Sequence, residues 1–199
     1  MENLSLHFII NEMNSKDGII TDVNNAINAG IKVVHYNDKK LRKRQIVENA
    51  YILSALCRKN NVLFFMQDYP DVAALVGADG VHLTQNDFCV KHVRRMLGDD
   101  KVIGVNFTSL RQAVNSEEEG VNYIAITVEN QKISMIIPRF RKLREIITIP
   151  IIAMGELSFP NIKELFEHGV DGVAMLSHLY EGNELQSNIK ETLTLLHSH

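Results

Sequence analysis

Four stretches of this chain repeat one pattern, and the pattern limits the folds that the chain can adopt. In each stretch a predicted helix ends, a glycine follows, and the chain continues into a short run of β-branched and other apolar residues. Glycine is expected directly after a helix, because it adopts the left-handed backbone conformation without a steric penalty. The glycines, Gly30, Gly77, Gly120 and Gly169, are 47, 43 and 49 residues apart. Each interval is too long for one strand–helix unit and fits two.

The apolar runs predict eight strands. Most are near-continuous runs of Ile, Val, Leu and Phe without polar alternation, which is typical of strands buried on both faces of a parallel sheet. Amphipathic segments separate them: apolar residues recur at helical spacing over Leu41–Lys59, and Ser158 with Pro160 indicates another helix start. The predicted strands are Leu6–Asn11, Lys32–Tyr36, Val62–Met66, Gly80–Leu83, Val102–Val105, Tyr123–Thr127, Pro150–Met154 and Gly172–Leu176.

Eight strands alternating with seven or eight helices in 199 residues indicate an α/β fold, a compact (β/α)8 TIM barrel forming a single domain over residues 1–199. The four glycines would then precede the even-numbered strands. The alternative is an open doubly wound sheet, which would require a glycine-rich phosphate turn after the first strand. The segment "IINEMNSKDG" at that point contains only Gly18, so we favour the barrel.

Composition argues against several classes of function. The formal net charge of −3 gives no indication of a nucleic-acid partner, and the basic cluster "KKLRKR" at residues 39–44 is typical of a solvated helix start. Cys57 and Cys89 are too far apart for a paired metal motif, and Cys57 lies on an apolar helical stripe. The N-terminal segment lacks a signal-peptide pattern, and no apolar run approaches the ~18 residues of a membrane span. We expect a cytoplasmic protein without a membrane partner; whether it forms a homo-oligomer stays open.

In a (β/α)8 barrel the chemistry lies at the carboxyl ends of the strands. Asp68 follows the third predicted strand and Asp87 the fourth, so their carboxylates could converge at one rim of the barrel mouth. Two carboxylates with water suit Mg²⁺, which keeps much of its hydration and is completed by substrate phosphate. Both acids could instead be turn or N-cap residues, because Asp is common at helix N-caps.

Other side chains at these strand ends suit a phosphorylated small molecule. Lys39 could meet a phosphate as a point charge, or could be an ordinary surface lysine. Gly155 and Ser177 follow the seventh and eighth strands, where backbone N–H groups commonly hold phosphate in such barrels. His35 ends the second strand and is the better candidate for a catalytic histidine, whereas His82 lies within a strand and is expected to be a hydrogen-bonded interior residue.

The segment "QDYPDVAALVGADGVHLTQND", residues 67–87, carries the most specific similarity to a known family. It resembles the pattern N-D-R-x-D-x-A-x-x-x-x-A-D-G-V-H-L-x-Q-x-D of the thiamine phosphate synthase superfamily, with Gln67 in place of the asparagine; the superfamily includes a thiazole tautomerase branch. Weaker matches are "VVHYNDKK", "VIGVNFTS", "IPIIAMGEL" and "GVDGVAMLSHL". Together these segments make the chain similar to that superfamily over roughly residues 6–182.

The resemblance implies a transferase of thiamine biosynthesis that joins hydroxymethylpyrimidine diphosphate to thiazole phosphate, releases pyrophosphate and uses Mg²⁺. It implies that Asp68 and Asp87 bind the metal and that Lys39 contacts the diphosphate. It also implies that Gly155 and Ser177 hold the thiazole phosphate. Further positions that bind substrate in the family are occupied here by Asn37, Gln67 and Asn106.

Several residues depart from the family pattern. His35 and Asn37 stand where the family has glutamine and arginine, and Glu156 stands where it has a second glycine. The loop "AITVENQKISM" after the sixth strand is shorter than the family's and lacks its T-x-T-K segment, for which Lys132 could substitute. Three hypotheses stay open. One is a divergent synthase. The second is an isomerase or tautomerase acting on another phosphorylated small molecule, with His35 or Glu129 as base. The third is a non-catalytic barrel that binds a phosphorylated ligand or a protein partner.

Overall fold

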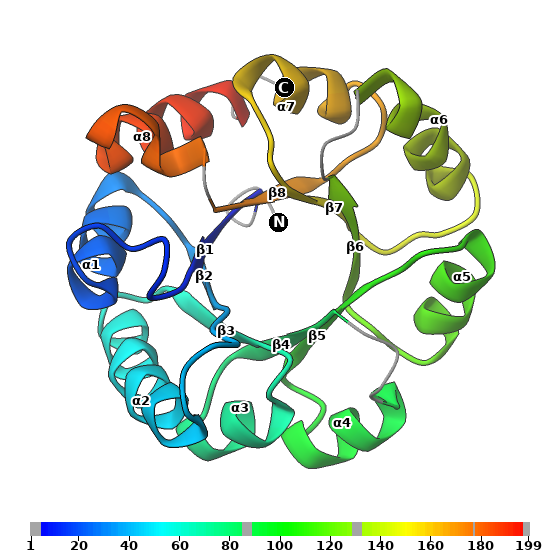
Figure 1. The fold of residues 1–199 in the computed structure, drawn as a ribbon. Helices are drawn as coiled ribbons and strands as arrows, with labels where there is room; N and C mark the ends of the chain where they lie inside the picture. The colour runs from blue at the N-terminus through cyan, green and yellow to red at the C-terminus, as the bar shows by residue number, and fades with distance from the viewer. Residues whose placement is uncertain (1–4, 85–88, 129–132, 177, 197–199) are drawn as a thin grey trace.

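Eight parallel strands close into a barrel in the computed structural model, which describes residues 5–84, 89–128, 133–176 and 178–196. The strands follow one another around the barrel in chain order, and β8 pairs with β1 to close it (Figure 1). The closed sheet confirms the predicted (β/α)8 barrel, and each strand boundary lies within one residue of its prediction. The strands are β1 (Leu6–Ile10), β2 (Val33–Tyr36), β3 (Leu63–Gln67), β4 (Gly80–Leu83), β5 (Val102–Asn106), β6 (Tyr123–Val128), β7 (Ile151–Gly155) and β8 (Gly172–Met175).

A ring of helices surrounds the barrel, one after each strand (Figure 1). The second helix begins at Lys43, two residues later than the periodicity predicts, and Ser158 precedes α7 as expected. No helix among the described residues is long and apolar enough to cross a membrane. The helices are α1 (Ile19–Ala29), α2 (Lys43–Lys59), α3 (Pro70–Val76), α4 (Val90–Leu97), α5 (Leu110–Glu118), α6 (Ile133–Arg144), α7 (Phe159–Phe166), the short 3₁₀ helix η2 (His178–Asn183) and α8 (Leu185–Leu196).

The repeated glycines end alternate helices, as the sequence predicts. Gly30, Gly77, Gly120 and Gly169 follow α1, α3, α5 and α7, and all four have positive φ. A residue with a side chain would be strained in this left-handed conformation. Each glycine therefore turns the chain from a helix back into an even-numbered strand.

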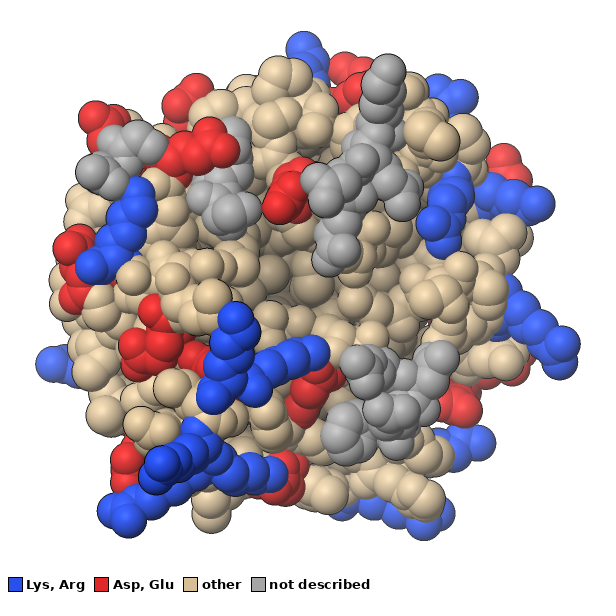
Figure 2. Space-filling model, in the orientation of Figure 1, with Lys and Arg blue, Asp and Glu red and all other residues tan. Residues whose placement is uncertain are grey.

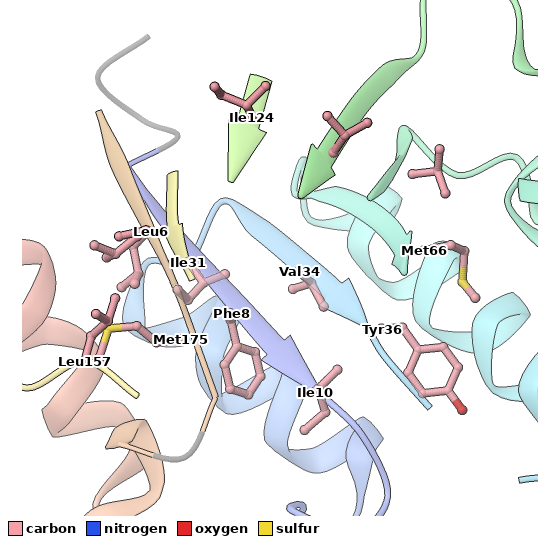
Figure 3. Close-up of a cluster of buried hydrophobic side chains, with 14 of the residues drawn as sticks. Leu6, Phe8, Ile10, Ile31, Val34, Tyr36, Met66, Ile124, Leu157 and Met175 are labelled. Carbon is pink, nitrogen blue, oxygen red and sulfur yellow. The ribbon is translucent and has the colours of Figure 1, made fainter. Parts of the chain in front are cut away.

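The main hydrophobic core fills the layer between the barrel and its helices. Alternate residues of each strand point outward into this layer, as Leu6, Phe8 and Ile10 of β1 do (Figure 3). They pack against helix residues such as Leu53 and the fully buried Cys57 of α2, which is a core residue as predicted. Full burial of one such aliphatic or aromatic side chain stabilises the fold by about 1.5–3 kcal/mol.

The barrel interior is partly polar. Ile9, Phe65, Ala125 and Met154 are among the apolar residues that face inward. On the same inward-facing positions the strands also carry three buried histidines and a buried tyrosine, namely His7, His35, His82 and Tyr123. Buried polar groups must be hydrogen-bonded or they destabilise the fold. This interior therefore requires a defined hydrogen-bond network directly beneath the barrel mouth.

Candidate functional site

Asp68, Lys39 and Thr84 meet at the carboxyl ends of three neighbouring strands. Lys39 Nζ lies 2.7 Å from Asp68 Oδ2 and donates to Thr84 Oγ1 at 3.3 Å. Thr84 donates its backbone N–H to Asp68 Oδ1 at 2.7 Å, and its hydroxyl donates to Asp68 Oδ2. The structure thus brings together two of the residues that the sequence selects, and Thr84 connects them.

The backbone of Asp68 is held in an unusual conformation. Its φ is +63°, which is uncommon for a residue other than glycine, although Asp tolerates it better than most. The backbone N–H of Asp68 donates to the carbonyl of His82 at 2.9 Å, which extends the pairing of β3 with β4. Strained backbone of this kind is concentrated at functional sites, where the surrounding contacts maintain it.

The charge on the Asp68 carboxylate is favoured despite partial burial. Burial by itself would raise its pKa, but hydrogen bonds from Lys39 and Thr84 and the charge of Lys39 together lower it. The side chain of Asp68 is 16% exposed and that of Lys39 is 49% exposed. The site therefore keeps an ionised carboxylate beside a half-exposed cation at the surface of the barrel.

The loop that carries Lys39 is held in place by the buried carboxylate of Asp38. One oxygen of Asp38 accepts hydrogen bonds from the backbone N–H groups of Lys40 and Leu41, at 3.1 and 3.3 Å. The other accepts from the N–H of Glu12 after β1, at 3.1 Å. Asp38 thus joins the loops after β1 and β2 and fixes the position from which Lys39 extends.

His35 points into the barrel and has no exposed surface. Its Nε2 lies 3.0 Å from His7 Nδ1, and its ring packs at 5.1 Å from that of Phe65. Burial, followed by the neighbouring His7 and His82, holds the pKa of His35 well below its ordinary value. The imidazole is therefore neutral at pH 7. Its predicted role as a catalytic residue stays a prediction, and the geometry places it beneath the mouth.

Three buried polar atoms near the ends of β2 and β3 have no hydrogen-bond partner within the described part of the chain. They are Nδ1 of His35, Oδ1 of Asn37 and Oε1 of Gln67. Leaving such a group unpaired costs about 1–3 kcal/mol, so each requires an explanation. Gln67 and Asn37 are two of the positions that the resemblance assigns to substrate, and a ligand N–H would satisfy both oxygens.

Asn106 is part of a hydrogen-bonded series of side chains on the neighbouring strands β4, β5 and β6. His82 Nδ1 is 2.9 Å from the Tyr123 hydroxyl, and His82 Nε2 is 3.1 Å from Asn106 Oδ1. Asn106 Nδ2 donates to Thr127 Oγ1 at 3.1 Å. Burial lowers the pKa of His82 to about 4, although Asn106 and Asp68 act in the opposite direction. His82 is thus a hydrogen-bonded interior histidine, as the sequence predicts.

Gly155 ends β7 at a point where only glycine fits. Its φ is +129°, and an added Cβ would lie 2.6 Å from the carbonyl oxygen of Val128. The next backbone N–H, that of Glu156, donates to the same carbonyl at 3.2 Å. That N–H is therefore engaged within the sheet and not directed to a phosphate. The Glu156 side chain is exposed.

Four of the predicted site residues lie outside the described residues: Asp87, Lys132, Ser177 and the alternative base Glu129. Among the described residues, no three His, Cys, Asp or Glu side chains gather as a metal cluster. The described part of the site therefore contains one carboxylate that suits a metal, Asp68, with the cation of Lys39 against it. Figure 2 shows acidic and basic side chains adjoining each other beside the recessed centre of the barrel, over the region of β2 and β3 in Figure 1.

Sequence reasoning did not assign a role to Thr84, Tyr123, His7 or Thr127. Thr84 lies one residue past β4, and the signal that could have found it is its position at a strand end beside Asp68. The other three lie at inward-facing strand positions. The period-two alternation of a strand shows which residues share a face, but the sequence does not show which face points into the barrel.

Comparison with known proteins agrees with this geometry. Residues 6–179 match the family model described as thiamine monophosphate synthase. The thiamine-phosphate synthase of Caldanaerobacter subterraneus subsp. tengcongensis is 34% identical over 175 residues, which cover 84% of this chain and 81% of that protein. The enzyme of the same name from Shouchella clausii is 30% identical over 176 residues, covering 85% and 84%.

A solved structure extends the similarity to three dimensions. The thiamine phosphate pyrophosphorylase of Pyrococcus furiosus superposes with a TM-score of 0.87 at 25% sequence identity, covering 99% of this chain and 98% of that one. The family model, the sequence relatives and the superposition all extend over most of the barrel, including the strand ends that carry Lys39, Asp68 and Thr84. The chain therefore belongs to the thiamine monophosphate synthase family.

Proposed function

We propose that this chain is a thiamine phosphate synthase: it joins hydroxymethylpyrimidine diphosphate to thiazole phosphate and releases pyrophosphate. The observation that carries the proposal is the contact of Lys39 with Asp68 and Thr84 at the barrel mouth, in a chain whose relatives carry the synthase name. A lysine held against an oriented carboxylate supports binding of a diphosphate together with a divalent cation.

The donor chemistry at Asp68 fits Mg²⁺, because the carboxylate is ionised, partly exposed and already held against a cation. We propose that Asp68 and Asp87 would hold the ion. When bound, Mg²⁺ would neutralise charge on the leaving diphosphate. The hydrogen bonds from Thr84 fix the orientation of the carboxylate before any ligand arrives. Such preorganisation reduces the free energy spent on reorganisation when charge develops.

The ammonium group of Lys39 can exchange its protein partner, Asp68, for the substrate. Its side chain is half exposed, so the ammonium can leave Asp68 and approach a diphosphate oxygen without a large desolvation cost. A charge-assisted hydrogen bond to phosphate would then replace the ion pair. Lys39 thereby stabilises the negative charge that builds up on the leaving group, a binding role and not that of an acid or a base.

The neutral histidines beneath the mouth suit a dissociative reaction. If the pyrimidine methylene leaves as a cation and the thiazole nitrogen captures it, positively charged histidines in the barrel interior would oppose formation of that cation. Burial lowers the pKa values of both His35 and His82, so the two imidazoles are uncharged at pH 7. The unpaired oxygens of Asn37 and Gln67 can accept hydrogen bonds from the heteroaromatic substrate. Asn106 would add a polar contact.

We further propose that Gly155 and Ser177 lie beside the thiazole phosphate, with Lys132 as an additional cation. Gly155 contributes through its lack of a side chain at the end of β7. The reaction would take place in the cytoplasm on small phosphorylated substrates, with neither a nucleic acid nor a membrane as partner. Size-exclusion chromatography with light scattering would decide between a monomer and a homo-oligomer.

The test is formation of thiamine phosphate from the two substrates with Mg²⁺. Wild-type protein should turn over, and Asp68→Asn should lose at least about 100-fold in rate. Glu48→Gln is the matched control, because Glu48 is exposed on α2 and forms an ion pair with Arg44 of the same helix. Its rate should stay within about twofold, as expected for an exposed ion pair. No turnover by a folded wild-type protein would refute the proposal and favour the isomerase or the non-catalytic barrel.

A further inference from the structure

Four side chains form a continuous hydrogen-bonded chain from the barrel interior to its mouth. It runs from Tyr123 of β6 to His82 of β4, then to Asn106 of β5, and returns to Thr127 of β6. The first two residues are buried and Thr127 is exposed. Gly104 leaves room for the ring of Tyr123, because a Cβ at position 104 would lie 1.9 Å from Cζ of Tyr123.

The direction of donation along this chain follows from its buried end. Burial raises the pKa of Tyr123, so its hydroxyl keeps its hydrogen. In the described part of the barrel, that hydroxyl forms its hydrogen bond with His82 Nδ1, at 2.9 Å. If His82 donated to Tyr123, the phenolic hydrogen would be buried without an acceptor, which is unfavourable. Tyr123 therefore donates to His82 Nδ1, and the hydrogen of the neutral imidazole is on Nε2.

The remaining links then have one arrangement. His82 Nε2–H donates to Asn106 Oδ1, which leaves the Asn106 amide nitrogen to donate to Thr127 Oγ1. Because Thr127 Oγ1 accepts this hydrogen bond, its own hydrogen is available to donate elsewhere. Among the described residues no acceptor for that hydrogen is present. Thr127 lies at the carboxyl end of β6 on an inward-facing position, so the donor is at the mouth.

We propose that Thr127 is a diphosphate-binding residue, whose hydroxyl is oriented toward a phosphate oxygen by Tyr123, His82 and Asn106. Thr127 would contact the substrate, and Tyr123, His82 and Asn106 act through it as positioning residues; the second amide hydrogen of Asn106 is left for the substrate contact proposed above. An oriented O–H donor suits an oxyanion, because a hydrogen bond to a charged acceptor is about twice as strong as one between neutral groups. The inference rests on the proposed function, since it names a further contact to the leaving group of that reaction.

The test is the binding of inorganic pyrophosphate with Mg²⁺, measured by isothermal titration calorimetry. Thr127→Val should weaken binding about tenfold, as expected for one lost hydrogen bond to a charged group. Thr127→Ser keeps the hydroxyl and should remain within about twofold. Thr21→Val, on the exposed face of α1, is the matched control and should leave binding unchanged. Circular dichroism melts establish that each variant is folded.

Tyr123→Phe tests the orienting chain separately, because it removes the donor that fixes the direction and leaves Thr127 in place. Binding should weaken by about threefold, less than for loss of the contact itself. Pyrophosphate binding by Thr127→Val equal to that of wild type would overturn the inference, as would Thr127→Ser as weak as Thr127→Val. Wild-type protein that does not bind pyrophosphate would also overturn it. Wild-type protein that binds pyrophosphate without forming thiamine phosphate would refute the proposed function alone.

Discussion

Lowering the pH from 7 to 5 should destabilise this barrel through His82. The imidazole is buried beside Tyr123 and Asn106, and burial lowers its pKa from 6.5 to about 4. In the unfolded chain the same group has its ordinary pKa of about 6.5 and takes up a proton as the pH falls. The unfolded state thus binds more protons in this range, so stability falls with pH. The contribution of neutral His82 is fully present above pH 6.5 and is lost progressively down to about pH 4.

The size of the effect follows from the width of this interval. One proton taken up only by the unfolded state changes the free energy of unfolding by about 1.4 kcal/mol per pH unit. Between pH 6.5 and pH 5 the loss is therefore about 2 kcal/mol. His35 contributes in the same direction, because its pKa is also lowered by burial. About 2 kcal/mol is a substantial part of the stability of an ordinary domain.

Urea unfolding at pH 7 and pH 5, followed by circular dichroism, measures the effect. His82→Gln should reduce the difference between the two pH values by about 2 kcal/mol relative to wild type, whatever its stability at pH 7. His92→Gln, exposed on α4, is the matched control and should leave the difference unchanged. If wild type and His82→Gln lost the same free energy to within about 0.5 kcal/mol, His82 would not be a buried neutral group and the reasoning would fail.

Three further predictions concern the same interior and its mouth. Gly104→Ala should destabilise the barrel by about 1–3 kcal/mol, because the added Cβ collides with the ring of Tyr123; urea unfolding measures this, and an unchanged midpoint would contradict it. Thr84→Val should cost about 1–2 kcal/mol by removing a hydroxyl donor to a carboxylate, and Thr84→Ser should recover most of it. Lys39→Met should raise the pKa of Asp68. As the pH is lowered, the variant should therefore lose the stability contributed by the ionised carboxylate at a higher pH than wild type does. Carbon-detected NMR titration of Asp68 would show no shift if the ion pair were unimportant.

The sequence alone was sufficient to predict the eight strands, their order around a closed barrel and the glycines that end alternate helices. These features depend on patterns local to the chain. A near-continuous apolar run predicts a strand buried on both faces, and a glycine after a helix predicts a left-handed turn. Asp68 and Lys39 were also found from sequence, because residues at strand ends meet at one face of a parallel barrel. The structure adds that Lys39 Nζ lies 2.7 Å from Asp68 Oδ2, a contact that the sequence did not predict.

The partners of these residues depended on the tertiary structure. Thr84 contacts Asp68 only because β3 and β4 pair in the register that sets Gln67 opposite His82. His35 lies one residue before the end of β2 and appeared from sequence to be available at the mouth, but the alternation of side chains along the strand turns it inward against His7 and Phe65. Contacts between residues far apart in sequence depend on register and strand direction, which local patterns do not specify.

The electrostatic state of the interior was likewise decided by the fold. A histidine in a sequence has no fixed charge at neutral pH, because its ordinary pKa lies close to 7. Closing the barrel buries His35 and His82, removes water from them and leaves them neutral. The sequence therefore determined that this chain folds into a barrel and which strand ends carry charged groups. The tertiary structure determined which groups are ionised and which hydrogen bonds point into the mouth, because both depend on burial and on partners from other strands.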